Sequence, residues 1–296
     1  QQVGLQLGFR RVIGSFDELR LAGTTVLLAG DWRVDLPWRA FGRALDTGLH
    51  AARIESREAG VARSSFGLDV GISPATNCWI SIGYNVDERR RDASYYDLLA
   101  SEARLCVFVA IAQGQLPQES WFALGRLLTT SGGEPVLLSW SGSMFEYLMP
   151  QLVMPTYDHS LLDQTARAAV ARQIEYGDQC GLPWGMSESG YSTVDVHLNY
   201  QYRAFGVPGL GLKRGLADDL VVSPYATVMA LMVAPEAACL NLQRLASAGA
   251  EGQFGFHEAI DYTPARQRRG ESHAMVHSYM AHHQGMSLLA LAYRLL

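Results

Sequence analysis

The sequence has few cysteines and no arrangement of them that would bind a metal. The four cysteines, Cys78, Cys106, Cys180 and Cys239, are widely spaced and form no CxxC pair. A zinc site needs clustered thiolates or imidazoles, and a disulfide scaffold needs many half-cystines in a short chain. We therefore expect reduced thiols and no metal site.

Long apolar runs are also missing. No stretch reaches the roughly 18 apolar residues of a membrane-spanning helix, and the start at Gln1 lacks the basic and apolar regions of a signal peptide. The chain begins without Met, and LLALAYRLL at residues 288–296 reads as a helix that is still running. We expect a soluble piece of a larger protein, with no direct membrane contact.

Excess positive charge is absent. The chain has 24 Lys and Arg against 29 Asp and Glu, which gives a net charge of −5. A nucleic-acid-binding surface needs surplus positive charge to displace counterions. Hydrophobic residues make up 48% of the chain, as in packed globular proteins. We exclude nucleic acid as a partner and expect a neutral or weakly polar substrate.

Sequence motifs for several common chemistries are not found. The chain has no GxGxxG opening a helix after a strand, no GxxxxGK[ST] phosphate loop, no HExxH and no GxSxG. The segment GVPGLGLKRG at residues 206–215 contains many glycines but lacks nucleotide-loop spacing and contains Pro208. We interpret it as a tight loop and predict no cofactor.

Helical periodicity dominates what is present. It predicts helices at residues 15–28, 37–59, 94–113, 117–128, 158–176, 223–232, 235–248 and 272–296. Two short runs, at residues 78–83 and 136–140, favour strands. At mean helix length the chain would hold roughly ten to twelve helices, which is enough for an all-α (α/α)6 toroid with a few β-hairpins. An irregular helical bundle fits the pattern equally well.

Acidic residues in aromatic-rich loops are the candidates for chemistry. Glycosidic-bond chemistry needs two carboxyl groups, one protonated to assist the leaving oxygen and one ionised. Glu146 follows Trp140 in SWSGSMFE, Glu188 lies between Trp184 and Tyr191, and Glu258 follows GQFGFH. A partly desolvated loop raises a carboxyl pKa and suits a general acid. Each glutamate alone also fits a helix-terminal or structural carboxylate.

Two further groups are weaker candidates. Asp92, Asp97 and Glu102 surround Tyr95 and Tyr96, and helix capping or surface solvation explains these acids as well as substrate contact does. His282, His283 and Gln284 follow each other on the last predicted helix. Adjacent residues of a helix do not share a face. We therefore expect hydrogen bonds to the core or to a sugar hydroxyl from this group, and no metal.

Taken together, several segments resemble one known family. They are residues 91–126, 139–150 (SWSGSMFEYLMP), 173–191, 200–216, 223–231, 252–264 (GQFGFHEAIDYTP) and 278–288. These segments are similar, in the same order, to the glucoamylase-like middle domain of bacterial cyclic β-1,2-glucan synthases. The resemblance covers roughly residues 60–296 and does not depend on any single short motif.

The resemblance implies a fold, an activity and a location. It implies that residues 1–296 form a single (α/α)6 domain. This domain would be part of a larger membrane-bound synthase that also has glycosyltransferase and phosphorylase-like modules. The domain would act on β-1,2-glucan on the cytoplasmic face of the bacterial inner membrane. It would close linear chains into rings by retaining transglycosylation, through a glycosyl-enzyme. A hydrolase of the same fold, or a non-catalytic glucan-binding module, is the alternative.

The resemblance also suggests roles for individual residues. Glu258 matches an acidic position where related inverting glucanases carry Asp, so we expect it to be the nucleophile, with Glu188 as acid/base and Glu146 as a substitute for either. The choice between Glu188 and Glu146 stays open. The expected substrate-binding residues are Trp140, Trp184, Tyr191, Tyr96, Asp97, Asp261, Tyr262, His282, His283 and Gln284.

Overall fold

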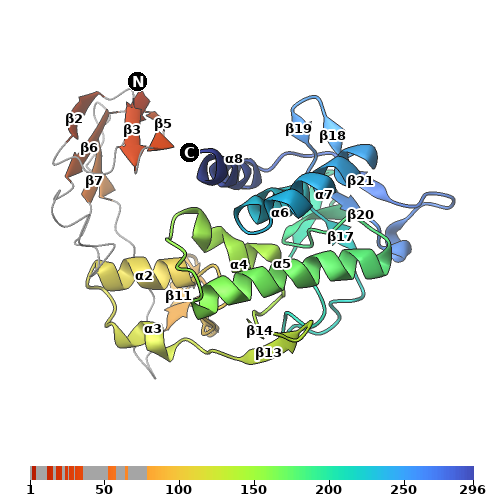
Figure 1. Cartoon of the computed structure of the whole chain (residues 1–296). Coiled ribbons are helices and arrows are strands. Elements are labelled where there is room, and N and C mark those ends of the chain that lie inside the picture. Colours follow the sequence, from red (N-terminus) through yellow and green to blue (C-terminus); the bar gives the residue numbers. More distant parts are fainter. Residues whose placement is uncertain are drawn as a thin grey trace. The chain divides into compact units, whose positions relative to one another are not determined.

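The computed structural model describes residues 79–296 without a gap, together with short strands within residues 2–65 (Figure 1). The chain divides into two compact units, which are described separately here. One comprises Gln1–Asp97 and Leu105–Leu124, and the other comprises Leu98–Arg104 and Gly125–Leu296. The expectation of a single domain over residues 1–296 stays a prediction.

The described strands before residue 79 form two four-stranded sheets, ordered β4–β3–β1–β5 and β2–β6–β7–β8. Their bounds are β1 Gln2–Gly4, β2 Val12–Ser15, β3 Glu18–Leu21, β4 Thr24–Thr25, β5 Leu27–Ala29, β6 Asp31–Asp35, β7 Arg53–Arg57 and β8 Ser64–Ser65.

These strands correct two helix predictions. The helix expected at residues 15–28 is wrong, because β3, β4 and β5 occupy that stretch. The sequence there combines β-branched Thr24 and Thr25 with glycines at 23 and 30, a pattern that favours short strands separated by turns. In the helix expected at 37–59, the described part is the strand β7, and residues 36–52 lie outside the described residues.

The rest of the first unit combines two short strand pairs with two helices. β9 (Ile80–Ser81) pairs with β12 (Tyr95–Tyr96), and β10 (Tyr84–Asn85) pairs with β11 (Arg90–Arg91). The helices are α2 (Arg104–Ala112) and α3 (Glu119–Ala123). The strand expected at 78–83 is confirmed at its centre. The helices expected at 94–113 and 117–128 are shorter than predicted, because strand pairing takes Tyr95–Tyr96 and Gly125 follows the second helix closely.

The second unit contains the remaining helices and four small strand groups. The helices are α4 Met144–Leu148, α5 Leu161–Cys180, α6 Pro224–Met229, α7 Pro235–Ser247 and α8 Ala281–Leu295, with 3₁₀ turns η1 Met149–Leu152, η2 Ala230–Met232 and η3 Pro264–Arg266. The strands are β13 Leu128–Ser131, β14 Glu134–Leu137, β15 Ser189–Val194, β16 Tyr200–Arg203, β17 Val221–Val222, β18 Glu251–Gly252, β19 Gly255–Phe256, β20 Ala259–Asp261 and β21 Ala274–Val276.

Helix α5 shows why the strongest periodic segments were predicted well. Ser160 caps its first turn by accepting a hydrogen bond from the Asp163 amide, and Gly181 ends it with a left-handed φ of 67°. Ala166, Ala169 and Gln173 form a buried stripe at helical spacing. The helices expected at 158–176, 223–232 and 235–248 are confirmed. The one expected at 272–296 begins only at Ala281, after strand β21.

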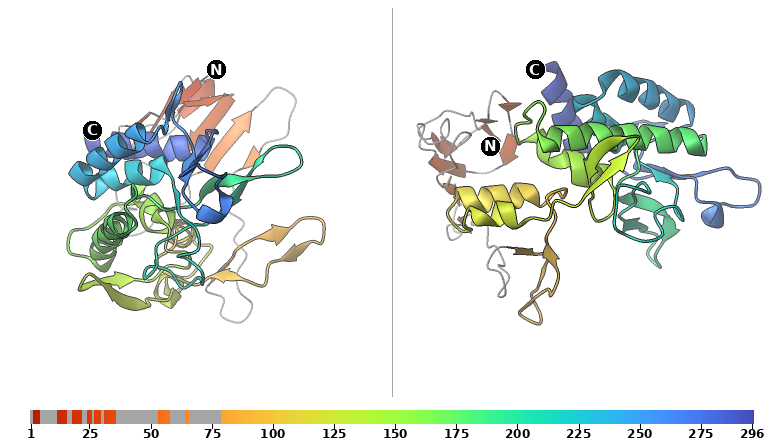
Figure 2. Two further views of the ribbon diagram at one scale, coloured as in Figure 1. Left: turned by 90° about the vertical axis from the view of Figure 1, so that its right-hand side faces the viewer. Right: turned by 60° about the horizontal axis from the view of Figure 1, so that its bottom comes forward.

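The core of the second unit surrounds α6 and strand β20. Every residue of α6 is buried, and this helix packs against α7 and α8 (Figures 1 and 2). Strand β20 lies between β17 and β21 and is fully buried. The hairpin β15–β16 packs against β20. Because α8, β15 and β20 meet at this core, residues far apart in sequence are brought together there.

The glycine-rich segment 206–215 is a tight loop, as expected. It runs against residues 139–142, and the Ser139 amide donates to the Leu210 carbonyl at 3.0 Å while the Leu212 amide donates to the Ser139 carbonyl at 3.1 Å. A Cβ atom on Gly206 would overlap the carbonyl oxygen of Ser141. Glycine at this position is therefore required by the close approach of two backbones.

We expect Gly206→Ala to lower the free energy of unfolding by about 1–3 kcal/mol, because two packed backbones would have to separate. Gly285→Ala is the matched control, since a Cβ at that helical position meets nothing within 4 Å. The control should raise stability by about 0.5–1 kcal/mol through its effect on the unfolded chain. Urea unfolding of both variants measures the difference, and equal effects would contradict the packing described here.

Candidate active site

Glu188 lies directly before β15, and its surroundings hold both its backbone and its carboxyl group. The Tyr225 hydroxyl lies 2.9 Å from the Glu188 carbonyl oxygen and 2.8 Å from Ser187 Oγ. The side chain of Glu188 is half-buried and hydrogen-bonded with the Tyr202 hydroxyl. This carboxyl group is therefore fixed in place while part of it stays accessible to a ligand.

The environment of Glu188 favours its protonated form. Burial, and then the negative charges of Glu102 and Glu146, raise the pKa of Glu188 from 4.5 to about 7. The hydrogen bond with Tyr202 and the positive charge of Lys213 act in the opposite direction. A carboxyl group with a pKa near neutrality can both donate and accept a proton during a reaction.

Glu258 lies directly before β20 and is enclosed. Glu258 is only 2% exposed, and its Oε1 accepts a hydrogen bond from the Gly190 amide at 3.1 Å. Nδ1 of His283 lies 2.9 Å from Oε1 and 3.0 Å from Oε2. The carboxylate of Glu258 is thus occupied by two protein partners and has almost no surface of its own.

His283 links Glu258 to Glu188. It lies near the start of α8, is 1% exposed, and stacks on the ring of Tyr225 at a centroid distance of 3.7 Å and an angle of 9°. Its Nε2 lies 3.4 Å from the Tyr202 hydroxyl oxygen. The structure therefore joins two of the expected glutamates in one chain of contacts, through Tyr202 and His283.

Glu146, in contrast, has a structural environment. It is the third residue of α4 and forms a capping box with Ser143. Its carboxylate accepts bonds from the hydroxyl groups of Ser139, Ser141 and Ser143 at 2.5–2.9 Å, and from three backbone amides. Because all of its acceptor positions are used, this carboxylate holds the loop 139–143 closed.

Glu102 is a residue that we did not select as catalytic. It is half-buried in the turn before α2, where Ser101 Oγ donates to its Oε2 at 3.2 Å. The buried Arg104 fixes this turn to α4 by donating to the carbonyl oxygens of Glu146 and Tyr147 at 2.8 and 2.6 Å. The charge of Glu102 is the largest electrostatic contribution to the raised pKa of Glu188.

The signal for Glu102 was present in the sequence. It belongs to the segment 91–126 that carried the family resemblance, but the predicted helix at 94–113 placed it inside a helix, where solvation explained it. The structure begins α2 at Arg104, so Glu102 lies in a turn before the helix.

Several expected substrate-binding residues are buried or engaged in packing and ion pairs. Trp184 is 3% exposed, and its backbone is held by Asn241. Asp261 is fully buried and bonded to Arg266, Thr263 and the Ser192 amide. Tyr191 packs against Phe205 with the guanidinium of Arg266 over its ring. Packing and ion pairing occupy much of the surface of these side chains, and their contact with a substrate stays a prediction.

Other expected residues remain accessible. Trp140 is 62% exposed, Tyr262 is half-buried, and His282 and Gln284 are exposed at the start of α8. The ring of His282 lies 4.0 Å from that of His283. Tyr96, half-buried, and Asp97, exposed, belong to the first unit.

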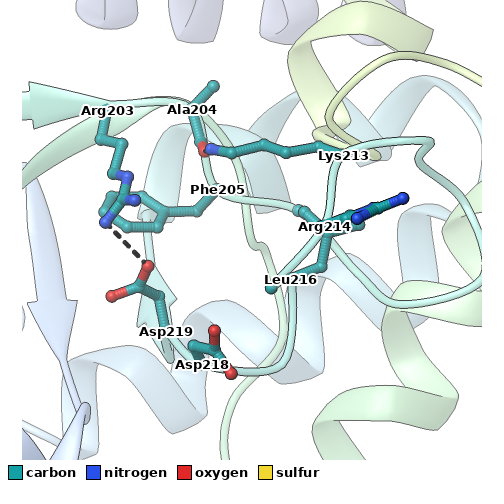
Figure 3. A pocket seen from close by; sticks show the side chains of 10 residues that line it. Arg203, Ala204, Phe205, Lys213, Arg214, Leu216, Asp218 and Asp219 are labelled. Atoms are coloured by element: carbon teal, nitrogen blue, oxygen red, sulfur yellow. Dashed lines mark hydrogen bonds and ion pairs between the residues drawn. The ribbon is translucent and has the colours of Figure 1, made fainter.

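A small charged cavity lies on the second unit (Figure 3). It measures about 210 Å³, and its lining includes Arg203, Lys213, Arg214, Asp218 and Asp219. Arg203 pairs with Asp219 at 3.1 Å, and Lys213 Nζ donates to the Ala204 carbonyl at 2.8 Å. Among the lining charges, those of Arg203 and Asp219 are paired with each other.

Two absences hold for the part of the chain that the structure describes. In that part, no group of three or more His, Cys, Asp or Glu side chains is placed to hold a metal ion. No helix there combines the length and the apolar character that crossing a bilayer requires.

The fold is that of known glucoamylase-like proteins. An endo-β-1,2-glucanase from Chitinophaga pinensis, solved with sophorotriose and glucose, matches with a TM-score of 0.51 and 16% identity over 75% of this chain and 55% of that chain. Putative glucoamylases from Bacteroides caccae and Bacteroides fragilis each match with a TM-score of 0.50, at 15% and 17% identity, over 75% and 73% of this chain and 55% and 52% of theirs.

The chain belongs to the glycoamylase family, described as putative glucoamylase, whose sequence model matches residues 94–293. It is 50% identical over 213 residues to the cyclic beta-(1,2)-glucan synthase NdvB of Rhizobium meliloti (strain 1021). This match covers 72% of the chain but only 8% of that relative. The family resemblance drawn from the sequence is confirmed.

We expect Glu146→Gln to lower the free energy of unfolding by about 2–3 kcal/mol, because an amide cannot accept the bonds that three serines and three amides donate to a carboxylate. Glu134→Gln, at an exposed position of β14, is the control and should change stability by less than about 0.5 kcal/mol. Thermal or urea unfolding measures both. Equal stability of the two variants would contradict a structural role for Glu146.

Proposed function

We propose that this chain acts on β-1,2-glucan, closing linear chains into rings by retaining transglycosylation, as one segment of a cyclic β-1,2-glucan synthase. The observation that carries the proposal is Glu188, an accessible carboxyl group whose pKa is raised to about 7 beside further carboxylates. The proposal is also supported by the 50% sequence identity of this chain to a segment of a cyclic β-1,2-glucan synthase.

Glu188 is the proposed general acid and base. Cleavage of a glycosidic bond requires a proton on the leaving oxygen, and the following step requires the same group to remove a proton from the attacking hydroxyl. A pKa near the working pH serves both steps. Among the three glutamates expected from the sequence, Glu188 alone has a partly exposed side chain. Its pKa is raised to about 7.

Glu102 is the proposed second carboxylate, in place of Glu258. A nucleophile must reach the anomeric carbon, and the Glu258 carboxylate is enclosed between Gly190 and His283. The carboxylate of Glu146 is enclosed by its serine loop. Glu102 is half-buried, and its negative charge acts on Glu188 more strongly than any other charge does.

The proposed reaction has two steps. The Glu102 carboxylate attacks the anomeric carbon of a glucose unit while Glu188 gives its proton to the departing glycosidic oxygen, and a glycosyl-enzyme ester forms. The 2-hydroxyl at the other end of the same glucan then attacks that carbon, Glu188 takes its proton, and the Glu102 carboxylate is released. No water is consumed, so the number of glycosidic bonds is conserved.

The setting of this reaction is part of the proposal. We propose that the helices belong to an (α/α)6 toroid and that exposed Trp140 and His282 contact the glucan. The chain would work on the cytoplasmic face of the bacterial inner membrane, alongside the glycosyltransferase and phosphorylase-like modules of a membrane-bound synthase. Its match to 8% of a much longer synthase supports a role as one module among several.

Incubation of the chain with linear β-1,2-glucan should give cyclic or length-redistributed products without new reducing ends. Glu188→Gln should lower the rate about 10²- to 10⁴-fold, because proton transfer to the leaving oxygen is lost. Glu102→Gln should abolish the glycosyl-enzyme, which mass spectrometry detects. Glu236→Gln, exposed on α7, is the control and should keep full activity.

Each other result has a definite meaning. Reducing ends that increase with time would replace the proposal with hydrolysis. Unchanged glucan, under conditions in which the control variant is folded, would reject enzymatic activity of the chain.

The pH dependence follows from the raised pKa of Glu188. The proton donor must be protonated, so kcat/KM should fall as pH rises above about 7. Because the folded chain holds this proton to a higher pH than the unfolded chain does, the protein should also lose stability between pH 4.5 and about 7 relative to Glu188→Gln. If the free energy of unfolding changed with pH in the same way for both proteins across that range, the raised pKa of Glu188 would be contradicted.

A further inference from the structure

We propose that the charged cavity beside the end of β16 is a subsite for one glucose unit of the glucan, bound between the ammonium group of Lys213 and the carboxylate of Asp218 (Figure 3). The cavity lies within the second unit and measures about 210 Å³. The inference deepens the proposed function and rests on it for naming the ligand as β-1,2-glucan. Its evidence is the set of unused donors and acceptors that line this space.

Lys213 is the only lysine among the 24 lysine and arginine residues of the chain. Its Nζ donates one hydrogen bond, to the Ala204 carbonyl at 2.8 Å, and has no other hydrogen-bond or ion-pair partner among the residues that the structure describes. An ammonium group carries three hydrogens, so two remain for a ligand. Figure 3 shows this side chain stretched along one edge of the cavity toward Ala204. An arginine there would bring a larger planar group into the same space.

The two aspartates of the cavity differ in what they bind. The Asp219 carboxylate accepts hydrogen bonds from Arg203 at 3.1 Å and from Arg266, so protein donors occupy it. The Asp218 amide donates to the Gly215 carbonyl at 3.1 Å, but the Asp218 carboxylate has no hydrogen-bond or ion-pair partner in the described part of the chain. Asp218 is exposed, and Figure 3 draws it on the edge of the cavity opposite Lys213. Its carboxylate is therefore an acceptor that a ligand can use.

The lining favours an uncharged ligand that both donates and accepts hydrogen bonds. A small anion attracted by Lys213 would also meet the negative charges of Asp218 and Asp219, and a cation would meet three positive charges. A sugar hydroxyl gives its hydrogen to a carboxylate and accepts one from an ammonium group. Phe205 and Leu216 add apolar lining for the C–H groups of a sugar ring. The cavity is smaller than the roughly 300–1,000 Å³ of sites for drug-sized ligands, so it suits one sugar ring.

The position of Lys213 places this cavity beside the proposed acid and base. The positive charge of Lys213 acts to lower the pKa of Glu188, and the negative charge of Glu188 in turn favours the charged form of Lys213. The Lys213 amide donates to the carbonyl of Trp140 at 2.8 Å, and Trp140 is 62% exposed. A glucan is longer than one unit, so a glucose held at Lys213 fixes the neighbouring units near Glu188. The cavity is thus a positioning site, separate from the bond that reacts.

The single lysine gives a direct reading of the cavity. Burial and the neighbouring charge of Arg203 lower the pKa of Lys213, which leaves more of its uncharged amine to react with an acylating reagent. In the unsubstituted chain, linear β-1,2-glucan at about ten times its dissociation constant should slow the acylation of Lys213 about tenfold, because only the empty cavity reacts. Mass spectrometry of the peptide that contains Lys213 measures the rate. The α-amino group of the chain is the internal control and should react at an unchanged rate.

Asp218→Asn tests whether the sugar contacts both edges of the cavity. It removes the charge of the acceptor at an exposed position, so the fold should stay intact. The glucan concentration that halves the acylation rate of Lys213 should rise about tenfold, the effect of one hydrogen bond to a charged group. Asp158→Asn, exposed before α5 in the same unit, is the matched control and should leave this concentration unchanged. Each variant is compared with its own acylation rate without glucan.

Three results would overturn the inference. The first is acylation of Lys213 that saturating glucan does not slow. The second is an equal half-protecting concentration for Asp218→Asn and Asp158→Asn, which would mean that glucan shields Lys213 from outside the cavity. The third is protection by inorganic phosphate at low salt but not by glucan, which would identify an anion site.

The labelling experiment separates this inference from the proposed function. Protection of Lys213 by a glucan whose length distribution stays unchanged would reject transglycosylation and support the subsite. Cyclic or length-redistributed products from a chain whose Lys213 stays unprotected would reject the subsite and support the function.

Discussion

The buried contact between Glu258 and His283 is the interaction on which the arrangement of the site depends. It ties the start of β20 to α8, while the same carboxylate binds the amide of Gly190 on β15 and the Glu258 carbonyl accepts the hydroxyl hydrogen of Ser223 next to α6. A buried charge without partners costs several kcal/mol, so these elements must assemble together for the carboxylate to be tolerated. The stacked ring of Tyr225 and the position of Glu188 both follow from that assembly.

Four glutamates, Glu102, Glu146, Glu188 and Glu258, have different surroundings in this structure. The Glu146 carboxylate accepts hydrogen bonds at all of its acceptor positions, and the Glu258 carboxylate contacts a backbone amide and an imidazole. The Glu188 side chain stays partly exposed, and its pKa is raised. Glu102 contributes its charge from a turn that Arg104 anchors to α4. Burial combined with many donors makes a carboxylate structural, whereas burial beside other negative charges makes a carboxyl group an acid.

The sequence predicted the parts of this molecule that depend on local patterns. Helix α5 was predicted because both its N-cap residue, Ser160, and the helical spacing of Ala166 and Ala169 can be recognised in the sequence. The strands within 15–28 were missed because residues there also fit a helical period, and strand pairing is decided by partners elsewhere in the chain. The same limit applies to the site. Loop glutamates could be selected from their neighbours, but the donors that occupy Glu146 and Glu258 come partly from packing that no local pattern reveals.

The proposed acid also explains why the site draws on so much of the chain. Glu102 and Glu188 are separated by about ninety residues in the sequence, yet burial and the negative charges of Glu102 and Glu146 together raise the pKa of Glu188 to about 7. Separate elements supply these charges: the turn before α2 brings Glu102, and α4 brings Glu146. The hydroxyl of Tyr202 on β16 acts in the opposite direction. The pKa of Glu188 is therefore set by groups that lie far from it in the sequence, while part of its side chain stays accessible.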